Sequence, residues 1–599
     1  MCFEHGLFLD AIPRADALRG LAALSALPLL PSMAERSPLH ARPLNEGRTW
    51  TAIEHTTALT GDDLTPLADA TILLKDDRIV AVGQAQHVTV PASAYRIDAR
   101  HTYTIPGLCD GHIHFFQSGG LYTRPDVIDL RAVRPYTDEL AWIKRNLHDT
   151  FARYLRAGIT SVVDVGGPFF NYDVRAEAQR TEVAPRVLVA GPLLSSVERE
   201  ILNPLGDPPI VKIDTLEAAT ALIDRQLARQ TDFVKFWWVV LPDHPANAFE
   251  PLARAAIEYA HGKGARVVIH AIELETARLA VESGADILAH SVFDTDVDDA
   301  FLELLRARKV IYTPTLIVLG NYGYTLHERP NLSQHDLRFA NPEIVGTLFG
   351  LQDVEQTLPP QLLAAVRSRR IPEPPHAAMR NLKRVQDAGI RIAAGTDAGN
   401  IGTQHASSLY DEFVAMVESG LSPRDVLKTA TLGGAALVNR SADLGTIAQG
   451  KLADLVILNA DPLVDIRAVA AVRQVVKDGH VYSPHAILQE SAADIVQRQV
   501  NAYNFHDAQV FGETYAASAR VRRDGKTIAT SRQEISAIYA KRFAQNPGLH
   551  VEIISREFHG STIVDREHVT GLGEQPLDAT ITYVVKDGLI AEAEIVTVS

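Results

Sequence analysis

Two histidines separated by one residue, His112 and His114, are the first side chains of this sequence that suggest chemistry. The spacing alone carries no weight, because a chain of 599 residues with 22 histidines is expected to contain such a pair by chance. The context is more informative, since the pair follows GLCDG at the end of a β-like run. On a strand, residues two apart point to the same face. Both imidazoles are therefore predicted to enter one interior space.

Other candidate metal ligands stand at the ends of apolar segments. His270 closes VVIHA, His290 closes ADILAH and Asp397 closes IAAGTD. A single buried histidine is more often a core residue, but parallel barrel strands bring their carboxyl ends to one mouth, where active sites lie. Imidazole and carboxylate bind zinc and similar ions. The two cysteines, Cys2 and Cys109, provide no thiolate framework.

Lys235 lies inside the apolar segment DFVKFWWVV, where a charged ammonium group is costly to desolvate. One interpretation is a lysine that reaches the rim or pairs with a carboxylate. The other is a lysine with a lowered pKa, present as a neutral amine. Such an amine can take up carbon dioxide and become an anionic carbamate that bridges two metal ions. The lysine by itself leaves both interpretations open.

The segment that must position these residues, 106–440, alternates apolar strands with helical stretches such as 251–264 and 274–284. Strand–helix alternation over this length predicts an α/β fold, and eight repeats favour a (β/α)₈ TIM barrel. A Pro-rich insertion at 320–379 is predicted to form a lid over the carboxyl face. The predicted strands are 109–115, 159–165, 186–191, 232–239, 265–271, 285–290, 309–315 and 391–398.

The sequences on either side of the barrel have a different texture. Segments 50–105 and 441–486 show period-two alternation broken by turn residues, which predicts one small β-sandwich assembled from both. Segment 491–599 opens with a helical stretch and continues with long alternating strands, which predicts a C-terminal α+β domain.

The first 49 residues contain an apolar run at 19–34 that ends in Ser-Met-Ala and is typical of a signal peptide. Three acidic residues before it argue instead for an amphipathic leader helix, so an exported and a cytoplasmic location are both left open. The run is too short to span a bilayer. A formal charge of −15 argues against nucleic-acid binding, and 46% hydrophobic with 22% charged residues excludes a disordered or multi-span membrane protein.

Ordered motifs between residues 52 and 482 resemble the amidohydrolase superfamily, especially its imidazolonepropionase-like and Xaa-Pro dipeptidase-like branch. The motifs are IPGLCDGHIHF, DFVKF, VVIHA, ILAH, GTDAGNIGTQH, LSPRDVLKTATLGGAALV and GTIAQGKLADLVIL. The resemblance implies a metal-bearing (β/α)₈ barrel with a flanking β-sandwich. It implies two divalent ions, with zinc expected. His112, His114 and Asp397 would bind the first ion, His270 and His290 the second, and a carboxylated Lys235 would bridge them.

The implied reaction is hydrolysis of an amide-type C–N bond by a metal-bridging hydroxide, with Asp397 as the catalytic acid–base. A dipeptide or an N-acyl amino acid is the favoured small-molecule substrate. The alternatives are a mononuclear-metal deaminase, a cyclic-amide hydrolase, or a non-catalytic scaffold with a ligand-binding C-terminal domain. The candidate substrate contacts are Trp237, Tyr322, Tyr324, His327 and His405.

The C-terminal segment 491–599 resembles SnoaL-like domains, which have the nuclear transport factor two-like cone fold. The resemblance leads us to expect a homo-oligomer, formed through this domain, or a role in substrate handling. His506, Asp507 and Asp565 could be acid–base residues. Helix capping explains the polar residues near 504–507 better.

Overall fold

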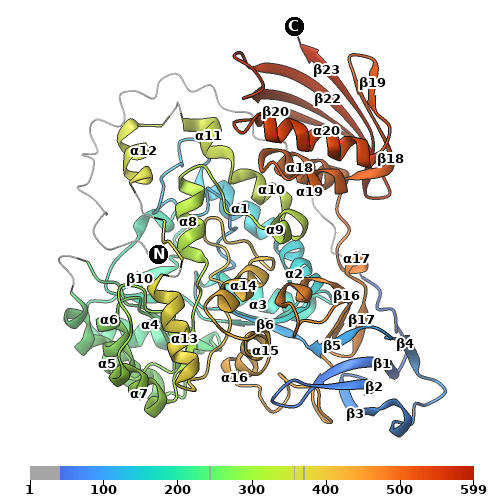
Figure 1. Ribbon diagram of the computed structural model, residues 1–599. Coiled ribbons are helices and arrows are strands. Elements are labelled where there is room, and N and C mark those ends of the chain that lie inside the picture. The colour runs from blue at the N-terminus through green and yellow to red at the C-terminus, as the bar shows by residue number, and fades with distance from the viewer. Residues whose placement is uncertain (1–40, 242–244, 356–357, 369–370, 375, 599) are drawn as a thin grey trace.

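The computed structural model describes residues 41–241, 245–355, 358–368, 371–374 and 376–598 (Figure 1). The run 19–34, predicted to be a signal peptide or a leader helix, lies outside the described residues. Within them, no helix is long and apolar enough to cross a membrane. The chain is packed from the first residues described, because Ala41 is buried and the Asn45 amide bonds to the backbone of Gly479 and Val481.

Eight strands from both sides of the barrel sequence form one continuous sheet, in the order β17-β16-β15-β5-β1-β2-β3, with β4 beside β1. The two flanks join where β15 pairs antiparallel with β5 and Leu455 lies opposite Pro106. The alternating apolar residues bury a common core that includes Ile72 and Ile457. The strands are β1 (Trp50–Thr60), β2 (Thr65–Lys75), β3 (Arg78–Gln84), β4 (Tyr95–Asp98), β5 (Tyr103–Pro106), β15 (Leu455–Leu458), β16 (Val472–Lys477) and β17 (His480–Tyr482).

The barrel is built from parallel strands in two hydrogen-bonded groups, β6-β7-β8 and β10-β9-β11-β12-β13-β14. A bridge between Ala190 and Phe233 links the groups. Seven of the eight predicted strand segments contain one of these strands. β9 and β10 lie outside the predicted segments. The strands of the two groups are β6 (Leu108–Ile113), β7 (Ile159–Asp164), β8 (Arg186–Val189), β9 (Leu193–Ser195), β10 (Ile210–Lys212), β11 (Phe233–Trp237), β12 (Arg266–His270), β13 (Ile287–Ala289) and β14 (Ile311–Thr313).

The eighth predicted strand, 391–398, closes the barrel without forming a regular strand. Ile392 bridges to Tyr312 of β14, and Ala398 bridges to Ile113 of β6. The ladder is interrupted because Asp397 has a positive φ of 62°, a left-handed conformation that a strand does not allow. The barrel is therefore closed by isolated bridges around the segment that carries the candidate ligand.

Helices cover the outside of the barrel, and most follow a strand as strand–helix alternation predicts. Their buried faces pack with the outward side chains of the strands into the largest apolar core of the described chain. They are α1 (Tyr136–Arg145), α2 (Leu147–Arg156), α3 (Phe170–Arg180), α4 (Leu216–Ala228), α5 (Ala246–Gly262), α6 (Leu274–Ser283), α7 (Asp299–Arg308), α13 (Ala377–Asp387), α14 (Ser408–Glu418), α15 (Pro423–Lys428) and α16 (Gly434–Leu437).

Among the described residues, five α-helices lie between β14 and α13, in and just before the predicted insertion. Figure 1 shows two of them, α9 and α10, between the barrel and the C-terminal domain. The apolar side chains of the insertion share one core with that domain. The helices are α8 (Val318–Leu326), α9 (Gln334–Phe339), α10 (Pro342–Thr347), α11 (Gly350–Val354) and α12 (Pro360–Arg367).

The C-terminal domain is a six-stranded sheet with helices packed against one face (Figure 1). Ser491 begins the domain's first long helix with a capping box, in which its side chain and Asp494 satisfy each other's backbone N–H groups. A short helix, α17 (Pro484–Ile487), precedes the domain and packs with α2 and β16. The elements of the domain are α18 (Ala492–Asn504), α19 (Ala508–Glu513), β18 (Tyr515–Arg523), β19 (Lys526–Ala529), α20 (Arg532–Gln545), β20 (His550–His559), β21 (Thr562–Thr570), β22 (Leu577–Lys586) and β23 (Leu589–Val598).

A buried charge cluster joins the barrel, the insertion and the C-terminal domain. Arg153 of α2 bonds to Asp149 at 2.7 Å and to the carbonyls of Phe339 and Ala340, both at 2.9 Å. Glu490 lies 3.4 Å from Arg153 and also pairs with Arg498 of α18. Because the Arg153 side chain is only 2% exposed, these contacts are shielded from water.

Replacing Arg153 should destabilise this junction. Arg153→Met leaves Asp149 without its buried cation, and breaking a buried pair costs about 3–5 kcal/mol. We expect a loss of that order in the free energy of unfolding, measured by urea denaturation. The control is Arg131→Met, since Arg131 pairs with Asp129 at the surface, where such a pair contributes about 0–1 kcal/mol. Equal losses in the two variants would contradict the assignment.

Candidate metal centre

Six candidate ligands gather at the carboxyl ends of the barrel strands. Five of them lie on a strand that is buried on both faces or directly after one, and Asp397 lies in the segment that closes the barrel, which explains why all six residues are no more than 4% exposed. Apolar strands therefore place these polar side chains in the barrel interior, where they are shielded from solvent. The six are His112, His114, Lys235, His270, His290 and Asp397.

The histidines and Asp397 are in direct proximity. Asp397 Oδ1 lies 3.1 Å from His114 Nε2 and 3.4 Å from His112 Nε2. The ring centroid of His290 lies 4.8 Å from that of His112 and 4.5 Å from that of His270. One ligand atom from each of His112, His290 and Asp397 falls within 4.8 Å of the others, a group that could hold a metal ion.

Lys235 reaches the same end of the barrel from β11. It pairs in register with Val268 of β12, and two residues later Trp237 pairs with His270. Burial lowers the pKa of His270 well below its usual range, and the charge of Lys235 lowers it further. Lys235 is therefore close enough to His270 for its charge to affect the pKa of that imidazole.

The backbone is strained at two of these residues. His290 has φ 78° and Asp397 has φ 62°, both in the left-handed region that side chains rarely adopt. The surrounding hydrogen bonds enforce these conformations, since His290 N donates to Thr313 O and Asp397 N donates to His112 O, both at 2.7 Å. Strain of this kind is concentrated at functional sites.

Two histidine rings are oriented by a second contact. His114 Nδ1 lies 2.7 Å from the Gly166 carbonyl, and His290 Nδ1 lies 2.7 Å from Thr315 Oγ1. A bond at Nδ1 fixes the ring and leaves Nε2 for a ligand. For His114 the carbonyl accepts, so Nδ1 is the donor, and Nε2 faces Asp397 Oδ1.

The protonation states fit a divalent metal ion. Burial lowers the pKa of His112 to about 4 and that of His290 well below its usual range, so these imidazoles are neutral. Burial alone would raise the pKa of Asp397, but His112 and His114 outweigh it and hold that pKa well below the usual range. Neutral imidazoles and an ionised carboxylate are the forms that bind metal. His112 Nδ1 is also buried without a hydrogen-bond partner among the described residues.

Trp237, one of the predicted substrate contacts, lies beside the histidines. Its ring packs edge to face against His270 at 6.2 Å, and the Arg199 guanidinium lies 5.2 Å from the ring centroid. Trp237 therefore contacts both His270 and Arg199, and Arg199 is partly exposed. Arg199 could not be predicted from the sequence, because a single arginine in a loop has no pattern.

Tyr322 belongs to a buried polar network. Its hydroxyl donates to Asn400 Oδ1 at 2.5 Å and accepts from Arg124 at 2.9 Å, while Arg124 makes two bonds to Asp126. Asn400 Nδ2 in turn donates to the Asp397 carbonyl at 3.0 Å. The network supports the backbone of Asp397. The hydroxyl of Tyr322 bonds to Asn400 and Arg124, and its contact with substrate stays a prediction.

The other two predicted contacts in the insertion lie on or after α8. His327 has both ring nitrogens engaged, with Nδ1 2.7 Å from the Gly323 carbonyl and Nε2 3.0 Å from the Arg367 carbonyl. It thereby ties the end of α8 to α12. Tyr324 is partly buried within α8.

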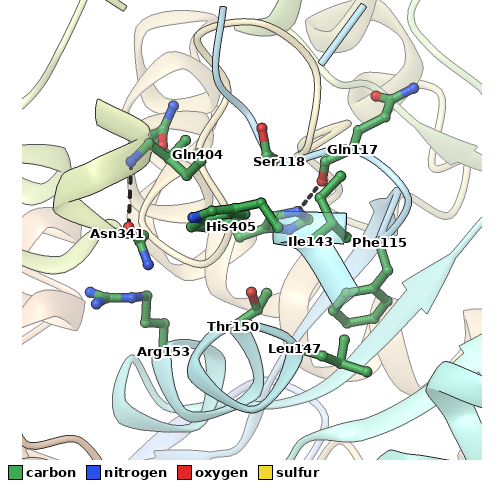
Figure 2. Close-up of a pocket in the computed structure, with 12 residues that line it drawn as sticks. Phe115, Gln117, Ser118, Ile143, Leu147, Thr150, Arg153, Asn341, Gln404 and His405 are labelled. Atoms are coloured by element: carbon green, nitrogen blue, oxygen red, sulfur yellow. Dashed lines mark hydrogen bonds between the residues drawn. The ribbon is translucent and has the colours of Figure 1, made fainter. Parts of the chain in front are cut away.

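His405 also has both ring nitrogens engaged. Nδ1 lies 2.8 Å from the Tyr154 hydroxyl, and Nε2 lies 2.8 Å from the Gln117 carbonyl (Figure 2). The ring stacks on Phe115 at 5.8 Å. His405 thus links α2 to the loop that follows His114 and lines a cavity beside it (Figure 2).

Comparison with known proteins identifies two regions. Residues 103–482 match the amidohydrolase family, and residues 496–593 match the SnoaL-like domain. Imidazolonepropionases from Salinispora tropica and Streptomyces griseus are 25% and 26% identical, each covering 69% of this chain and 92% and 93% of their own length. A Xaa-Pro dipeptidase crystallised with methionine in its active site superposes with a TM-score of 0.55 at 20% identity, over 72% of this chain and 100% of its own. This last likeness concerns the fold alone.

The contact between Thr315 and His290 provides a test of the centre. Thr315→Val removes the hydroxyl and keeps the shape, so we expect zinc affinity to fall by about 10–100-fold, as for other groups that orient a metal ligand. The measurement is competition with a chromogenic chelator. Thr313→Val is the matched control, because Thr313 is equally buried and its hydroxyl has no described hydrogen-bond partner. An unchanged affinity in Thr315→Val would contradict the assignment.

Proposed function

The chain belongs to the amidohydrolase family, and from this premise we propose that it cleaves the amide bond of a dipeptide or an N-acyl amino acid with the help of two divalent ions. That it is a hydrolase acting on carbon–nitrogen bonds follows from the family and from the imidazolonepropionase relatives. The observation that carries the finer proposal is the burial of four histidines, Asp397 and Lys235 together at the barrel mouth.

We assign the ligands in two groups. His112, His114 and Asp397 would hold one ion, because Asp397 Oδ1 lies within 3.4 Å of both rings. His270 and His290, whose rings lie 4.5 Å apart, would hold the other. Imidazole and carboxylate favour zinc or a similar divalent ion.

Lys235 is proposed as the bridging ligand. Its neutral Nζ would bond to the carbon of carbon dioxide and release one proton, which replaces a cation with an anionic carbamate. The burial of Lys235 among histidines supports this assignment, since desolvation disfavours the ammonium form.

Bound ions would lower the pKa of a bound water and polarise the scissile carbonyl. Asp397 would take the proton from the attacking water and deliver it to the leaving nitrogen. Its pKa, held low by His112 and His114, keeps it ionised, the form that both a metal ligand and a proton acceptor require. The 2% exposure of Asp397 excludes bulk water from the transfer.

Two features at the mouth support a substrate with a carboxylate and an apolar group. Arg199, stacked on Trp237, offers a cation near His270. A mostly apolar pocket of about 470 Å³, part of it open to solvent, is lined in part by Phe116, whose ring packs edge to face against His114 at 5.7 Å. A dipeptide or an N-acyl amino acid carries both groups.

A mononuclear site is the second candidate. The ligand atoms that cluster within 4.8 Å come from His112, His290 and Asp397, which is enough for one ion. Together with the imidazolonepropionase relatives, this favours a cyclic-amide hydrolase or a deaminase as the alternative. A non-catalytic scaffold is disfavoured because all six candidate ligands are present and buried.

Metal analysis of Lys235→Ala separates one ion from two. We expect two metal equivalents per chain in the native protein and at most one in the variant, because the bridging ligand is lost. Hydrolysis should fall on the order of 10²–10³-fold, a loss comparable to that of one transition-state contact, and propionate should restore part of it. The control is Lys212→Ala, a partly exposed lysine on β10. Full activity in Lys235→Ala, or one equivalent in the native protein, would overturn the bridged centre.

Substitution of Arg199 tests the substrate class. A library of dipeptides and N-acyl amino acids, each also prepared with an amidated carboxyl terminus, provides the substrates. Arg199→Ala should raise KM for the free carboxylates by about 10-fold, the loss of one charge-assisted hydrogen bond, and leave the amidated series unchanged. Arg199→Lys should recover part of the difference. Equal KM changes in both series would contradict carboxylate recognition, and no hydrolysis of any member would contradict the substrate class.

A further inference from the structure

The C-terminal domain contains a cavity far along the chain from the metal centre. About 580 Å³ of space, part of it open to solvent, lies between α18, α20 and the inner face of the sheet. Most of its wall is apolar or aromatic, which suits a small organic molecule. The lining includes Val500, Tyr503, Tyr539, Val569, Ala579 and Ile581.

The polar groups of the cavity form a cluster at its buried side. The Tyr583 hydroxyl donates to Glu567 Oε1 at 3.1 Å, and Gln499 Nε2 donates to the Tyr515 hydroxyl at 3.2 Å. These four side chains are no more than 8% exposed. Gln499 Oε1 is buried with no hydrogen-bond partner among the described residues. Gln499 lines the cavity and is only 4% exposed. A buried acceptor without a partner usually bonds to a ligand or to an ordered water, which indicates a binding site here.

Glu567 differs from the neighbouring acidic residue on the same strand. Asp565 is held by two bonds to Arg556, at 2.7 and 2.6 Å, and is thereby a paired carboxylate. Burial, with the charge of Asp565, raises the pKa of Glu567 to about 8. Glu567 is therefore protonated at neutral pH and can donate to an acceptor in the cavity.

Two partly exposed arginines complete the lining. The Arg542 guanidinium lies 4.7 Å from the centroid of Tyr539, and Arg523 is the last residue of β18. The Nε of Arg523 is buried and has no hydrogen-bond partner in the part of the chain that the structure describes. Because both arginines line the cavity and still reach solvent, they mark its cationic, open end.

We propose that this cavity binds a small carboxylic acid with an apolar body and a carbonyl group, with its carboxylate at Arg523 and Arg542 and its carbonyl at Glu567. The body would lie against the tyrosines and aliphatic side chains of the wall. His506 and Asp507 take no part, since His506 bonds to the Leu549 carbonyl and Asp507 caps α19. The site is independent of the amide hydrolysis proposed for the barrel.

The probe is 4-acetylbenzoate, which has a ring, a carboxylate and a carbonyl but no amide for the barrel to cleave. We expect calorimetry on the full chain to give a Kd on the order of 0.1–1 mM, ordinary for so small a ligand. Methyl 4-acetylbenzoate lacks the charge and 4-ethylbenzoate lacks the carbonyl. Both should bind at least about 10-fold more weakly, the loss of one such contact.

Neighbouring arginines on β18 form a matched pair of variants. Arg523→Ala should weaken binding of the probe at least about 10-fold, whereas Arg522→Ala should leave it unchanged, because Arg522 pairs with Glu594 away from the cavity. Glu567→Leu should weaken 4-acetylbenzoate and not 4-ethylbenzoate. Ala579→Phe should fill the cavity and abolish binding, with circular dichroism to check its fold.

Four results would overturn the proposal. The first three are no saturable binding of 4-acetylbenzoate at 10 mM (on the order of ten times the expected Kd), equal losses in Arg523→Ala and Arg522→Ala, and undiminished binding by folded Ala579→Phe. Loss of binding in Lys235→Ala would also overturn it, since the probe would then occupy the barrel. Absence of amide hydrolysis would leave all of these measurements intact, so the two proposals fail separately.

Discussion

The contact between β6 and residues 391–398 is the constraint on which the candidate metal centre depends. Gly111 N donates to Ala394 O at 2.8 Å and Asp397 N to His112 O at 2.7 Å, so closing the barrel also brings Asp397 to the histidine pair. The approach requires Gly395, because a Cβ there would lie 2.7 Å from that of His112. Asp110 reinforces it by accepting from Thr396 N and Oγ1. The hydrogen bonds that close the barrel are thus the same ones that place Asp397 beside the histidine pair.

Much of the fold could be predicted from the sequence because its determinants are local. Apolar strands alternating with helices specify a parallel α/β barrel, and a polar residue ending such a strand must lie at the mouth. The same rule predicts that His270, His290 and Asp397 lie at one end of the barrel. It did not reveal that 391–398 lacks a regular strand, since the positive φ of Asp397 is set by the barrel around it.

Long-range polar contacts could not be predicted. Tyr322 and His405 are predicted substrate contacts because aromatic and imidazole groups near a mouth suit that role, and nothing in their local sequence indicates the protein contacts that they also make. Their described partners, Arg124 and Gln117, lie 198 and 288 residues away in sequence. No local pattern distinguishes a side chain that meets a substrate from one that fastens two loops. Arg153, which joins three parts of the chain, is for the same reason an ordinary charge in sequence.

Three buried carboxyl groups show how surroundings decide what a residue type can do. Asp397 is ionised because His112 and His114 outweigh its burial, and Asp565 is fixed by Arg556 in a paired geometry. Glu567, two residues from Asp565, has a tyrosine as its hydrogen-bond partner and is protonated at neutral pH. Asp397 can accept a proton, and Glu567 can donate one. Asp565 is occupied by Arg556 and joins strands β20 and β21. The barrel holds its buried acid, Asp397, as a carboxylate, whereas the C-terminal domain holds Glu567 in the protonated form. The two sites are therefore suited to different ligands.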